Sequence, residues 1–405
     1  MPYPINPTLD AVVEPPIPEI RAWVAGREPP PGLALIDAAR AVPDRPPPGA
    51  LTDHLAVRLA EPDMALYTEI LGMPALRAAF AEALSRRYGG SVASAQVGIT
   101  AGGNQAFAVA MMGLAGPGDE VLLPLPYYWN HKMWLDMLGV RSVYLPFRPD
   151  RAAVPDPADA AARITPRTRA IVLVTPNNPT GAVYSPETLA SFAALARAHG
   201  LALVLDETYK DFLPPPPDGA DAGAAPAAPH ALLAAPNWPD TVVQVHSFSK
   251  VFGLTGYRVG AVVAGERLMR QIGKAMDCVA ICAPRVGQEA ALYGLRHLES
   301  WAAGNRAALA GRIGALRSAF AAAGTPYEIV SAGAFFAYVR HPFAGFAAAE
   351  VARRLAQEHF VLCIPGSAFG PEQEPFLRIA VSNLDMPSIA ELAVRLAASS
   401  RNPER

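Results

Sequence analysis

The sequence predicts an α/β protein with a mostly parallel sheet that is covered by helices on both faces. Short, nearly continuous apolar runs, such as AIVLVT at 170–175 and LALVLDET at 201–208, alternate with segments whose apolar residues recur at helical spacing. Strands that are buried on both faces of a sheet have this pattern. The chain has 405 residues, of which 51% are hydrophobic. This length exceeds what one core usually serves, so we expect two domains or one large elaborated domain.

The remaining elements follow from the same periodicities. A helix is predicted at 185–200, because Ser185 is a good N-cap residue and Pro186 suits the first turn. A long helical connector is predicted from 285 to about 323, and a second α/β unit after it. Further strands are predicted at 120–125, 140–147, 241–247, 258–265, 334–339 and 376–382, and further helices at 71–90 and 106–116.

Two segments are unusual in composition. Residues 1–50 are rich in proline, so we expect them to be mostly extended and to lie over other elements. Residues 214–239 are a Pro/Ala-rich insertion, which we expect to form a mobile surface loop without a function of its own.

Composition excludes several classes of protein. A formal charge of -2 gives no basic surface for nucleic acid or an acidic membrane, and no apolar run is long enough to cross a bilayer. The first residues lack a secretory signal. The three cysteines (Cys278, Cys282 and Cys363) cannot all pair and have no nearby metal-ligand partners, so we expect reduced thiols, no metal site and a cytoplasmic location. A GxGxxG motif after a strand, typical of nicotinamide binding, is absent.

Four polar stretches follow predicted strands, where open α/β sheets bind ligands. They are TAGGNQAF at 100–107, TPNNPTG at 175–181, DETYKDF at 206–212 and HSFSKVFGLTGYRVG at 246–260. Taken singly, each also fits an ordinary turn. The paired glycines of the first stretch, at a helix start, suit an anion.

The chemistry of the last two stretches is more specific. A lysine that is desolvated at a strand end has a lowered pKa and becomes a competent nucleophile. Lys250 is in that position, and Arg258 can bind two oxygens of a phosphate with its planar fork. Asp206 ends a buried strand and can hold a negative charge against a cationic ring nitrogen.

Together these motifs resemble the class I/II aminotransferases, the pyridoxal-phosphate enzymes of the aspartate aminotransferase superfamily. NNPTG, DETY, SFSK and an arginine after the lysine stand in the family's order and spacing. FLRIAVSN at 376–383 and YTEILGMPALR at 67–77 match two further family segments. The resemblance covers roughly residues 20–395.

The resemblance implies a role for each matched residue. Lys250 is expected to form the aldimine with the cofactor and to move the substrate proton, and Asp206 to pair with the pyridine nitrogen. Asn178 and Tyr209 are expected at the phenolic oxygen, and Tyr128, or else Tyr127, against the ring. The phosphate is expected to be bound by Gly103, Asn104, Ser247 and Arg258, with Ser249 a further candidate, and by Tyr67 from the neighbouring subunit. Arg378 is expected to bind the substrate carboxylate, and Asn178 to contact the substrate as well.

The resemblance also implies an architecture. It is the fold type I of pyridoxal-phosphate-dependent transferases: a large domain with a mostly parallel, seven-stranded type of sheet, and a smaller α/β domain. We expect an N-terminal arm and part of the small domain at 1–52, the large cofactor-binding domain at 53–289, and a connecting helix with the C-terminal small domain at 290–405. Tyr67 implies a homodimer with shared active sites.

One departure from the family lies near the substrate. The family often has Gly-x-Pro in the N-terminal loop, whereas AVP at 41–43 places Ala41 at the glycine position. Its methyl group narrows the approach to the carboxylate, and we expect Ala41 to be a substrate contact.

The expected reaction is transfer of an amino group between an amino acid and a 2-oxo acid. A lyase of the same superfamily is the alternative, and a pyridoxal-phosphate-binding regulator without turnover is less favoured, because too few residues precede the match for a DNA-binding segment. The sequence does not identify the particular amino acid and 2-oxo acid. His131 and Lys132 suit either an acidic substrate group or an exposed loop, and Trp23, Trp129 and Trp134 either an aromatic pocket or the core.

Overall fold

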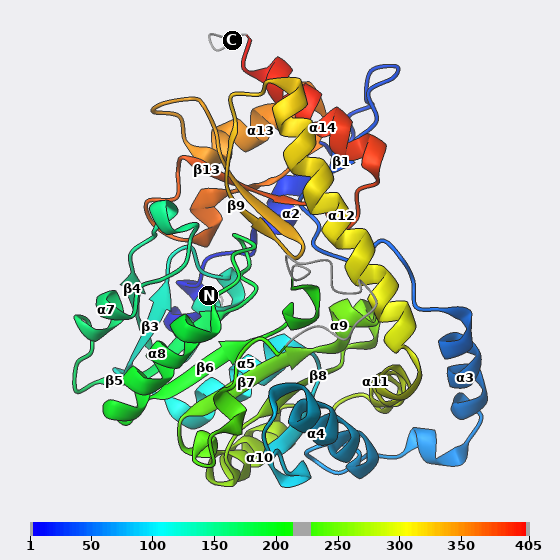
Figure 1. The fold of residues 1–405 in the computed structure, drawn as a ribbon, viewed down its shortest axis with the longest axis vertical. Helices are drawn as coiled ribbons and strands as arrows, with labels where there is room; N and C mark the ends of the chain where they lie inside the picture. The colour runs from blue at the N-terminus through cyan, green and yellow to red at the C-terminus, as the bar shows by residue number, and fades with distance from the viewer. Residues whose placement is uncertain (1–2, 214–227, 402–405) are drawn as a thin grey trace.

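The computed structural model describes residues 3–213 and 228–401, and the chain forms two lobes (Figure 1). The larger lobe is built on a seven-stranded sheet with the order β2-β8-β7-β6-β5-β3-β4. Strand β8 is antiparallel to both of its neighbours, while β3, β4, β5, β6 and β7 pair in parallel. The prediction of a mostly parallel sheet is therefore confirmed. Its strands are β2 (Val97–Thr100), β3 (Glu120–Pro124), β4 (Arg141–Leu145), β5 (Thr168–Val174), β6 (Ala202–Asp206), β7 (Val242–Ser247) and β8 (Gly260–Val263).

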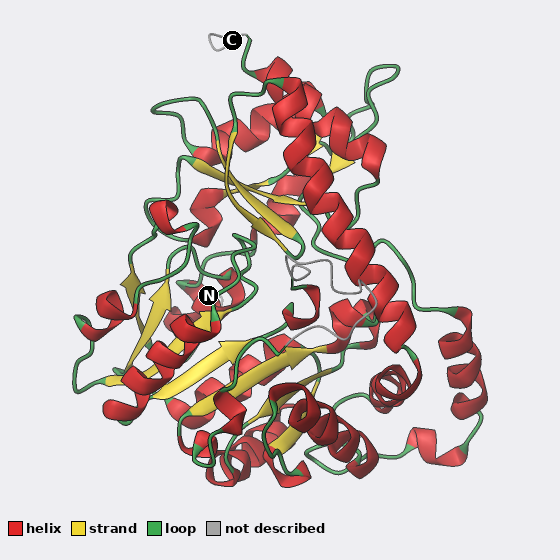
Figure 2. Ribbon diagram, viewed as in Figure 1, coloured by secondary structure: helices red, strands yellow, loops and turns green. Residues whose placement is uncertain are grey.

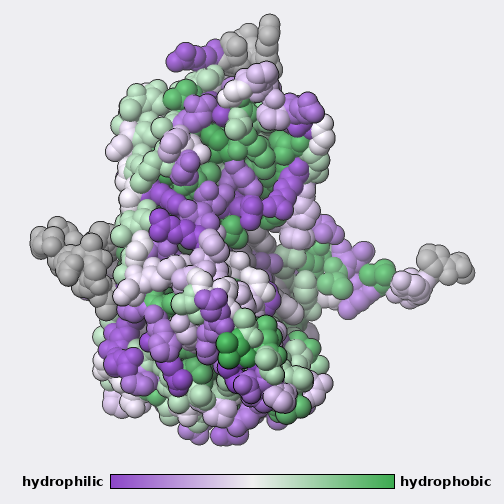
Figure 3. All heavy atoms as spheres, turned by 90° about the vertical axis from the view of Figure 1, so that its right-hand side faces the viewer, coloured by the Kyte–Doolittle hydropathy of each residue, from purple (hydrophilic) through white to green (hydrophobic). Residues whose placement is uncertain are grey.

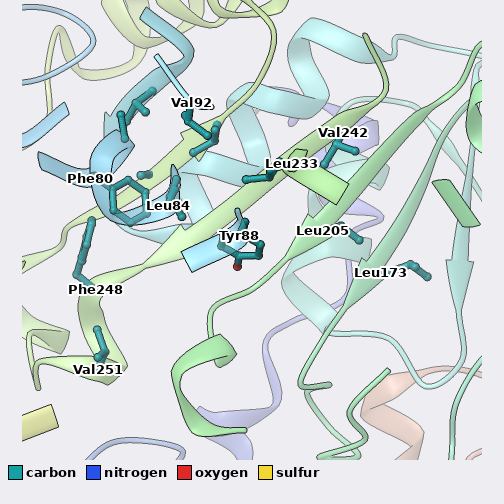
Figure 4. Packing of buried hydrophobic residues seen from close by; sticks show 14 of the residues in the cluster. Phe80, Leu84, Tyr88, Val92, Leu173, Leu205, Leu233, Val242, Phe248 and Val251 are labelled. Atoms are coloured by element: carbon teal, nitrogen blue, oxygen red, sulfur yellow. The ribbon is translucent and has the colours of Figure 1, made fainter. Parts of the chain in front are cut away.

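Helices cover both faces of this sheet, as Figure 2 shows. One face packs on α5 (Gly103–Leu114), α6 (Trp129–Met137) and α10 (Glu266–Ala280), and Val172, Val204 and Val245 point to this side. The other face packs on α4 (Pro74–Tyr88), α8 (Pro186–Ala198) and α11 (Arg285–His297), with Ile171, Leu203 and Leu205. Figure 4 shows α4 contributing Phe80, Leu84 and Tyr88 to this second layer. Successive strand residues thus enter opposite cores, which is why the strands are apolar without alternation.

The smaller lobe holds an antiparallel sheet with the order β12-β13-β10-β9. Its strands are β9 (Glu328–Gly333), β10 (Phe336–Arg340), β12 (Ile364–Pro365) and β13 (Phe376–Ala380). Helices α12 (Glu299–Ala323), α13 (Ala348–His359) and α14 (Met386–Ser399) pack on it. Strand β1 (Ile36–Asp37) pairs in parallel with β11 (Val361–Leu362), so N-terminal residues complete the C-terminal lobe. The bounds of the two domains stay a prediction.

The structure refines several predicted elements. The connector from 285 is two helices, α11 and α12, separated at Leu298. Ser185 caps α8 as predicted, since its hydroxyl accepts a hydrogen bond from the Thr188 amide. The proline-rich start includes two short helices, α1 (Pro7–Asp10) and α2 (Pro16–Ala22), that were not predicted. The remaining helices are α3 (Gly49–Leu59), α7 (Pro157–Ala161) and α9 (Phe248–Val251) and the 3-10 helices η1 (Pro62–Ala65), η2 (Ser94–Gln96), η3 (Pro149–Arg151), η4 (Lys210–Phe212), η5 (Leu232–Ala234), η6 (Trp238–Asp240), η7 (Thr255–Tyr257) and η8 (Gly366–Phe369).

The prediction of a mobile loop at 214–239 is wrong for its second half, and residues 214–227 lie outside the described part. His230 and Trp238 are each only 2% exposed, and Leu233 packs in the core beside α4 (Figure 4). The Trp238 indole nitrogen donates a hydrogen bond to the Ser91 carbonyl oxygen. The low-complexity composition hid these three anchoring side chains.

The lobes touch through close backbone contact. A Cβ on Gly181, which follows β5 and has φ +71°, would lie 2.4 Å from the Gly333 nitrogen at the end of β9. Only glycine allows this approach. The TPNNPTG turn is thereby set between the two sheets. Within the described residues, no helix combines the length and the apolar character that a membrane span requires.

Candidate active site

The predicted strand-end residues lie around one cavity of ≈ 230 Å³, at the edge of the large sheet where β5, β6 and β7 end. Most of the residues expected at the cofactor line it, as do Ser249 and four residues that the sequence did not single out, Val42, Val174, Thr208 and Thr255. The expected residues on its wall are Gly103, Asn104, Tyr128, Asn178, Asp206, Tyr209, Ser247, Lys250 and Arg258. Five separate stretches of chain therefore meet at one place.

Asp206 is a buried carboxylate at one side of this cavity. His131 Nε2 lies 3.0 Å from its Oδ2 atom, and the Thr208 amide donates to its Oδ1 atom at 2.9 Å. Burial alone would raise the pKa of Asp206, but the hydrogen bonds and charge of these partners hold the pKa below its ordinary value. Asp206 therefore stays ionised in an apolar setting.

His131 has a role that the sequence did not reveal. It is neither a substrate contact nor an exposed loop residue: it is buried on α6 and stacks on Phe107 of α5, with ring centroids 3.9 Å apart. Lys132 instead pairs with Asp136 one turn further along α6. The only sequence signal for this role was a histidine shortly after the matched Tyr128. The orientation of His131 depends on the packing of α5 against α6, which the sequence does not show.

Lys250 lies on the short helix α9, where Ser247 accepts a hydrogen bond from the Ser249 amide and caps the helix. The Lys250 amine donates a 2.7 Å hydrogen bond to the carbonyl oxygen of Ala41. Burial, together with the positive charges of Arg378 and Arg258, lowers the pKa of Lys250 to about 8. No carboxylate within the described residues pairs with it, so the neutral amine is far more populated near neutral pH than in an ordinary lysine.

The start of α5 and Arg258 form a cradle for an anion. Gly102 has φ +90°, and a Cβ there would lie 2.3 Å from Arg258 Nη2. Among the described residues, the Arg258 guanidinium donates only to the backbone carbonyl oxygens of Thr255 and Ala101. The amides at the start of α5 and this guanidinium converge beside Ser247, an arrangement that favours a phosphate.

Arg378, on β13 of the small lobe, is 2% exposed yet has no carboxylate partner in the described chain. Its guanidinium donates to Asn178 Oδ1 at 3.2 Å and to the Ala39 carbonyl oxygen. The rings of Trp129, Phe336 and Phe369 surround it at 5.4, 5.0 and 5.5 Å. Burial lowers the pKa of Arg378 to about 10, and its Nε atom is buried without a hydrogen bond. A bound carboxylate would satisfy this cation.

The two candidate tyrosines separate clearly. Tyr128 lines the cavity, and its hydroxyl donates to Asn104 Oδ1 at 3.4 Å. Tyr127 stacks on Tyr144 outside that cavity. The geometry therefore favours Tyr128 at the ring. Tyr209 is 5% exposed and packs on Phe335 and Phe336.

Two expected residues stand apart from this group. Tyr67 is 74% exposed and does not line its own chain's cavity. Ala41, the expected substrate contact, does not line the cavity, and its carbonyl oxygen accepts a hydrogen bond from the Lys250 amine. Asn177 is structural, because its side chain holds the turn through Thr180 and Tyr184.

A buried polar network supports the strand ends from behind. Glu207, next to Asp206, accepts hydrogen bonds from the Tyr88 hydroxyl at 2.8 Å and from Gln244 Nε2 at 2.6 Å. His230 Nε2 lies 3.2 Å from the other Glu207 oxygen. These contacts join α4, β6 and β7, and they fix Asp206 and Ser247 relative to one another.

Comparison with known proteins agrees with this geometry. Residues 30–396 match the family of class I and II aminotransferases. The chain is 28% identical over 335 residues to a putative aminotransferase, YugH, of Bacillus subtilis, covering 82% of each chain. It is 30% identical over 315 residues to the arginine–pyruvate transaminase AruH of Pseudomonas aeruginosa, covering 78% of this chain and 77% of that one. A single mutant of Thermus thermophilus aspartate aminotransferase superposes with a TM-score of 0.86 at 26% identity, covering 98% of this chain and 99% of that one.

The fold and the site define a pyridoxal-phosphate enzyme of fold type I. The chain belongs to the aminotransferase class I and II family. It is an aminotransferase that uses an amino acid and a 2-oxo acid as substrates and pyridoxal 5′-phosphate as cofactor.

The residues of the cavity fit this cofactor. Its anionic phosphate suits the cradle of Arg258, Ser247 and the start of α5, and its ring nitrogen suits the ionised Asp206. Its aldehyde suits an amine of lowered pKa, which Lys250 supplies.

The pKa of Lys250 gives a direct prediction for the cofactor-free protein. The rate of Lys250 acetylation, measured by mass spectrometry at a series of pH values, should rise with a midpoint near pH 8, because the neutral amine is the reactive form. Arg378→Met should raise this midpoint, since one nearby positive charge is removed. A wild-type midpoint at or above 10 would contradict the electrostatics described.

Proposed function

We propose that Lys250 is the residue that binds the cofactor covalently and then moves the substrate proton. When bound, the pyridoxal ring supplies an electron sink for the negative charge that develops at the substrate Cα. The neutral Lys250 amine accepts the Cα proton, and Asp206, kept ionised by His131 and Thr208, holds the positive charge of the ring nitrogen. The position of Lys250 at the cavity and the lowered pKa of its amine support this role.

The other residues of the site bind the cofactor and orient it. Arg258, Ser247, Gly103 and Asn104 hold the phosphate, and Tyr128 packs against the ring. The Asn178 side chain accepts from Arg378 with its oxygen, which leaves its amide nitrogen to donate to the phenolic oxygen together with Tyr209.

Arg378 binds the substrate α-carboxylate in this proposal. The observation that carries it is a guanidinium 2% exposed, ringed by aromatic side chains and without a carboxylate partner in the described chain. Such a buried cation is costly unless a ligand pairs with it. The Ala39 carbonyl oxygen accepts a hydrogen bond from the Arg378 guanidinium and helps to hold it in place.

We also propose a homodimer with shared sites. Tyr67 and its neighbours Leu66 and Ile70 are exposed on the large lobe. The N-terminal arm projects from the body in Figure 3 and exposes Ile5 and Val13. Apolar groups arranged in this way favour contact with a second copy. We place the enzyme in the cytoplasm on composition alone, because its three cysteines cannot all pair.

The reaction and the lysine are tested together. Incubation with a panel of amino acids and 2-oxoglutarate or pyruvate should yield the new amino acid in equal amount to the oxo acid formed. A superfamily lyase would instead release a fragment or ammonia without a new amino acid.

Borohydride reduction of the loaded enzyme and peptide mapping should place the pyridoxyl label on Lys250. A label on another lysine would refute the assignment.

The shared site predicts complementation between two inactive variants, Tyr67→Ala and Lys250→Ala. In a mixed dimer one site carries both lesions, while the other keeps Lys250 and receives Tyr67 from its partner. Co-refolding should therefore raise activity above that of the Tyr67→Ala parent. If verified mixed dimers show no recovery, each site is built from a single chain.

A further inference from the structure

Tyr67 stands on a loop, residues 66–73, that links η1 to α4. Its side chain is 74% exposed, and no other described residue forms a hydrogen bond or a ring contact with it. A loop without helix or strand takes its position from the groups that anchor its backbone and side chains. The place of Tyr67 is therefore set by the contacts of its neighbours in this loop.

The buried side chain of Gln288, on α11, anchors this loop at two points. Its Oε1 atom accepts a hydrogen bond from the Met73 amide at 2.7 Å, and its Nε2 atom donates one to Thr68 Oγ1 at 3.0 Å. Nε2 also donates to the Ala283 carbonyl oxygen at 2.9 Å, just before α11 begins, which fixes the side-chain amide on its own helix. The amide of Gln288 thus uses its oxygen and both N–H groups, and it joins the loop to α11.

Helix α11 also holds the chain on the other side of Tyr67. Arg285 Nη2 lies 2.6 Å from the carboxylate of Asp63, which belongs to η1. Arg285 and Gln288 are three positions apart, so they lie on the same face of α11. The loop approaches this face closely, because a Cβ on Gly72 would lie 2.9 Å from Gln288 Oε1. One turn of α11 therefore holds the chain before and after Tyr67.

The same turn of α11 also packs against the anion cradle of its own chain. A Cβ on Gly287 would lie 2.3 Å from the carbonyl oxygen of Tyr257, the residue before Arg258. In the proposed function Arg258 serves the cofactor phosphate of its own chain, whereas Tyr67 serves that of the second copy. A change in this turn can therefore act on either site, and an experiment has to separate the two effects.

We propose that Gln288 is a positioning residue for the active site of the other subunit. It holds residues 66–73 where Tyr67 can donate a hydrogen bond to the cofactor phosphate, and it acts only through this loop, since it does not line the cavity of its own chain. This inference rests on the proposed homodimer with shared sites. Without the amide of Gln288, the Thr68 hydroxyl and the Met73 amide lose a partner, and the loop gains a freedom that opposes an ordered contact of Tyr67.

The first test compares the affinity of the cofactor-free enzyme for pyridoxal 5′-phosphate and for pyridoxal, which has no phosphate. Tyr67→Phe should raise the Kd for pyridoxal 5′-phosphate at least about tenfold, because a hydrogen bond to a charged group is lost. Gln288→Met keeps the length of the side chain, and Thr68→Val removes only the hydroxyl. Each should raise this Kd at least about threefold, since the contact of Tyr67 is weakened but not removed. The Kd for pyridoxal should stay at the wild-type value in all three variants.

Two controls accompany this measurement. Thr52→Val should leave both affinities unchanged, because the Thr52 hydroxyl donates within α3, to the Gly49 carbonyl oxygen. Thr68→Val combined with Tyr67→Phe should bind pyridoxal 5′-phosphate as Tyr67→Phe alone does, because a positioning effect disappears with the group that is positioned. If Gln288→Met does not fold, Thr68→Val takes its place in both tests.

The second test asks on which subunit Gln288 acts. In a mixed dimer of Gln288→Met and Lys250→Ala chains, the site that keeps Lys250 receives Tyr67 from the chain with intact Gln288. Borohydride labelling of Lys250 at a series of cofactor concentrations reports on that site alone, and its affinity should be that of wild type. With both substitutions on one chain and a wild-type partner, the labelled site receives the displaced Tyr67. Its affinity should then fall as in the Gln288→Met homodimer.

The inference is wrong if Gln288→Met and Thr68→Val bind pyridoxal 5′-phosphate like wild type, or if they weaken pyridoxal binding equally. It is also wrong if the loss of affinity stays with the chain that carries Gln288→Met. Each of these results, beside a weakened Tyr67→Phe, leaves the shared site of the proposed function intact. An unchanged Kd for Tyr67→Phe would instead overturn the shared site itself and, with it, the role of Gln288.

Discussion

The active site depends on a buried carboxylate that must remain ionised. Asp206 ends β6 between two cores, where burial opposes its charge. His131 compensates on one side and the Thr208 amide on the other. His131 can do so only because it is clamped against Phe107 between α6 and α5, which makes helix packing a condition of the site's electrostatics. Behind the sheet, Glu207 and its partners hold the ends of β6 and β7 together, so Asp206 at the end of β6 and Lys250 on α9, directly after β7, face one cavity.

The smaller lobe completes this site rather than merely covering it. Arg378 reaches Asn178 of the large lobe, and the close approach of Gly181 and Gly333 sets the turn that carries Asn178. The N-terminal segment contributes backbone carbonyl oxygens to both Arg378 and Lys250. The N-terminal segment, the large lobe and the small lobe are distant in sequence, but all three contact Arg378 or Lys250. These contacts fix the position of each part relative to the other two.

Much of this was readable from the sequence. Apolar runs fixed the expectation of strands buried on both faces, and polar motifs after those runs predicted Asp206, Asn178 and Lys250 at one sheet edge. The antiparallel direction of β8 was not readable, because an apolar run has the same pattern in either direction. His131, Thr208 and Glu207 were missed or misread, since their roles arise from contacts between elements. The burial of His230 and Trp238 could not be predicted from the Pro/Ala-rich composition around them, because composition describes the whole segment and not the environment of single side chains.

The most direct test of the central claim is kcat at saturating cofactor for Asp206→Ala, with His131→Asn and Asp206→Glu beside it. In the proposed function the Asp206 carboxylate stabilises the protonated ring nitrogen, so kcat of Asp206→Ala should fall at least about a hundredfold. His131→Asn should lie between that variant and wild type, because the carboxylate remains but loses a partner, and Asp206→Glu should keep part of the rate. A near-wild-type kcat for Asp206→Ala with cofactor bound would contradict the account.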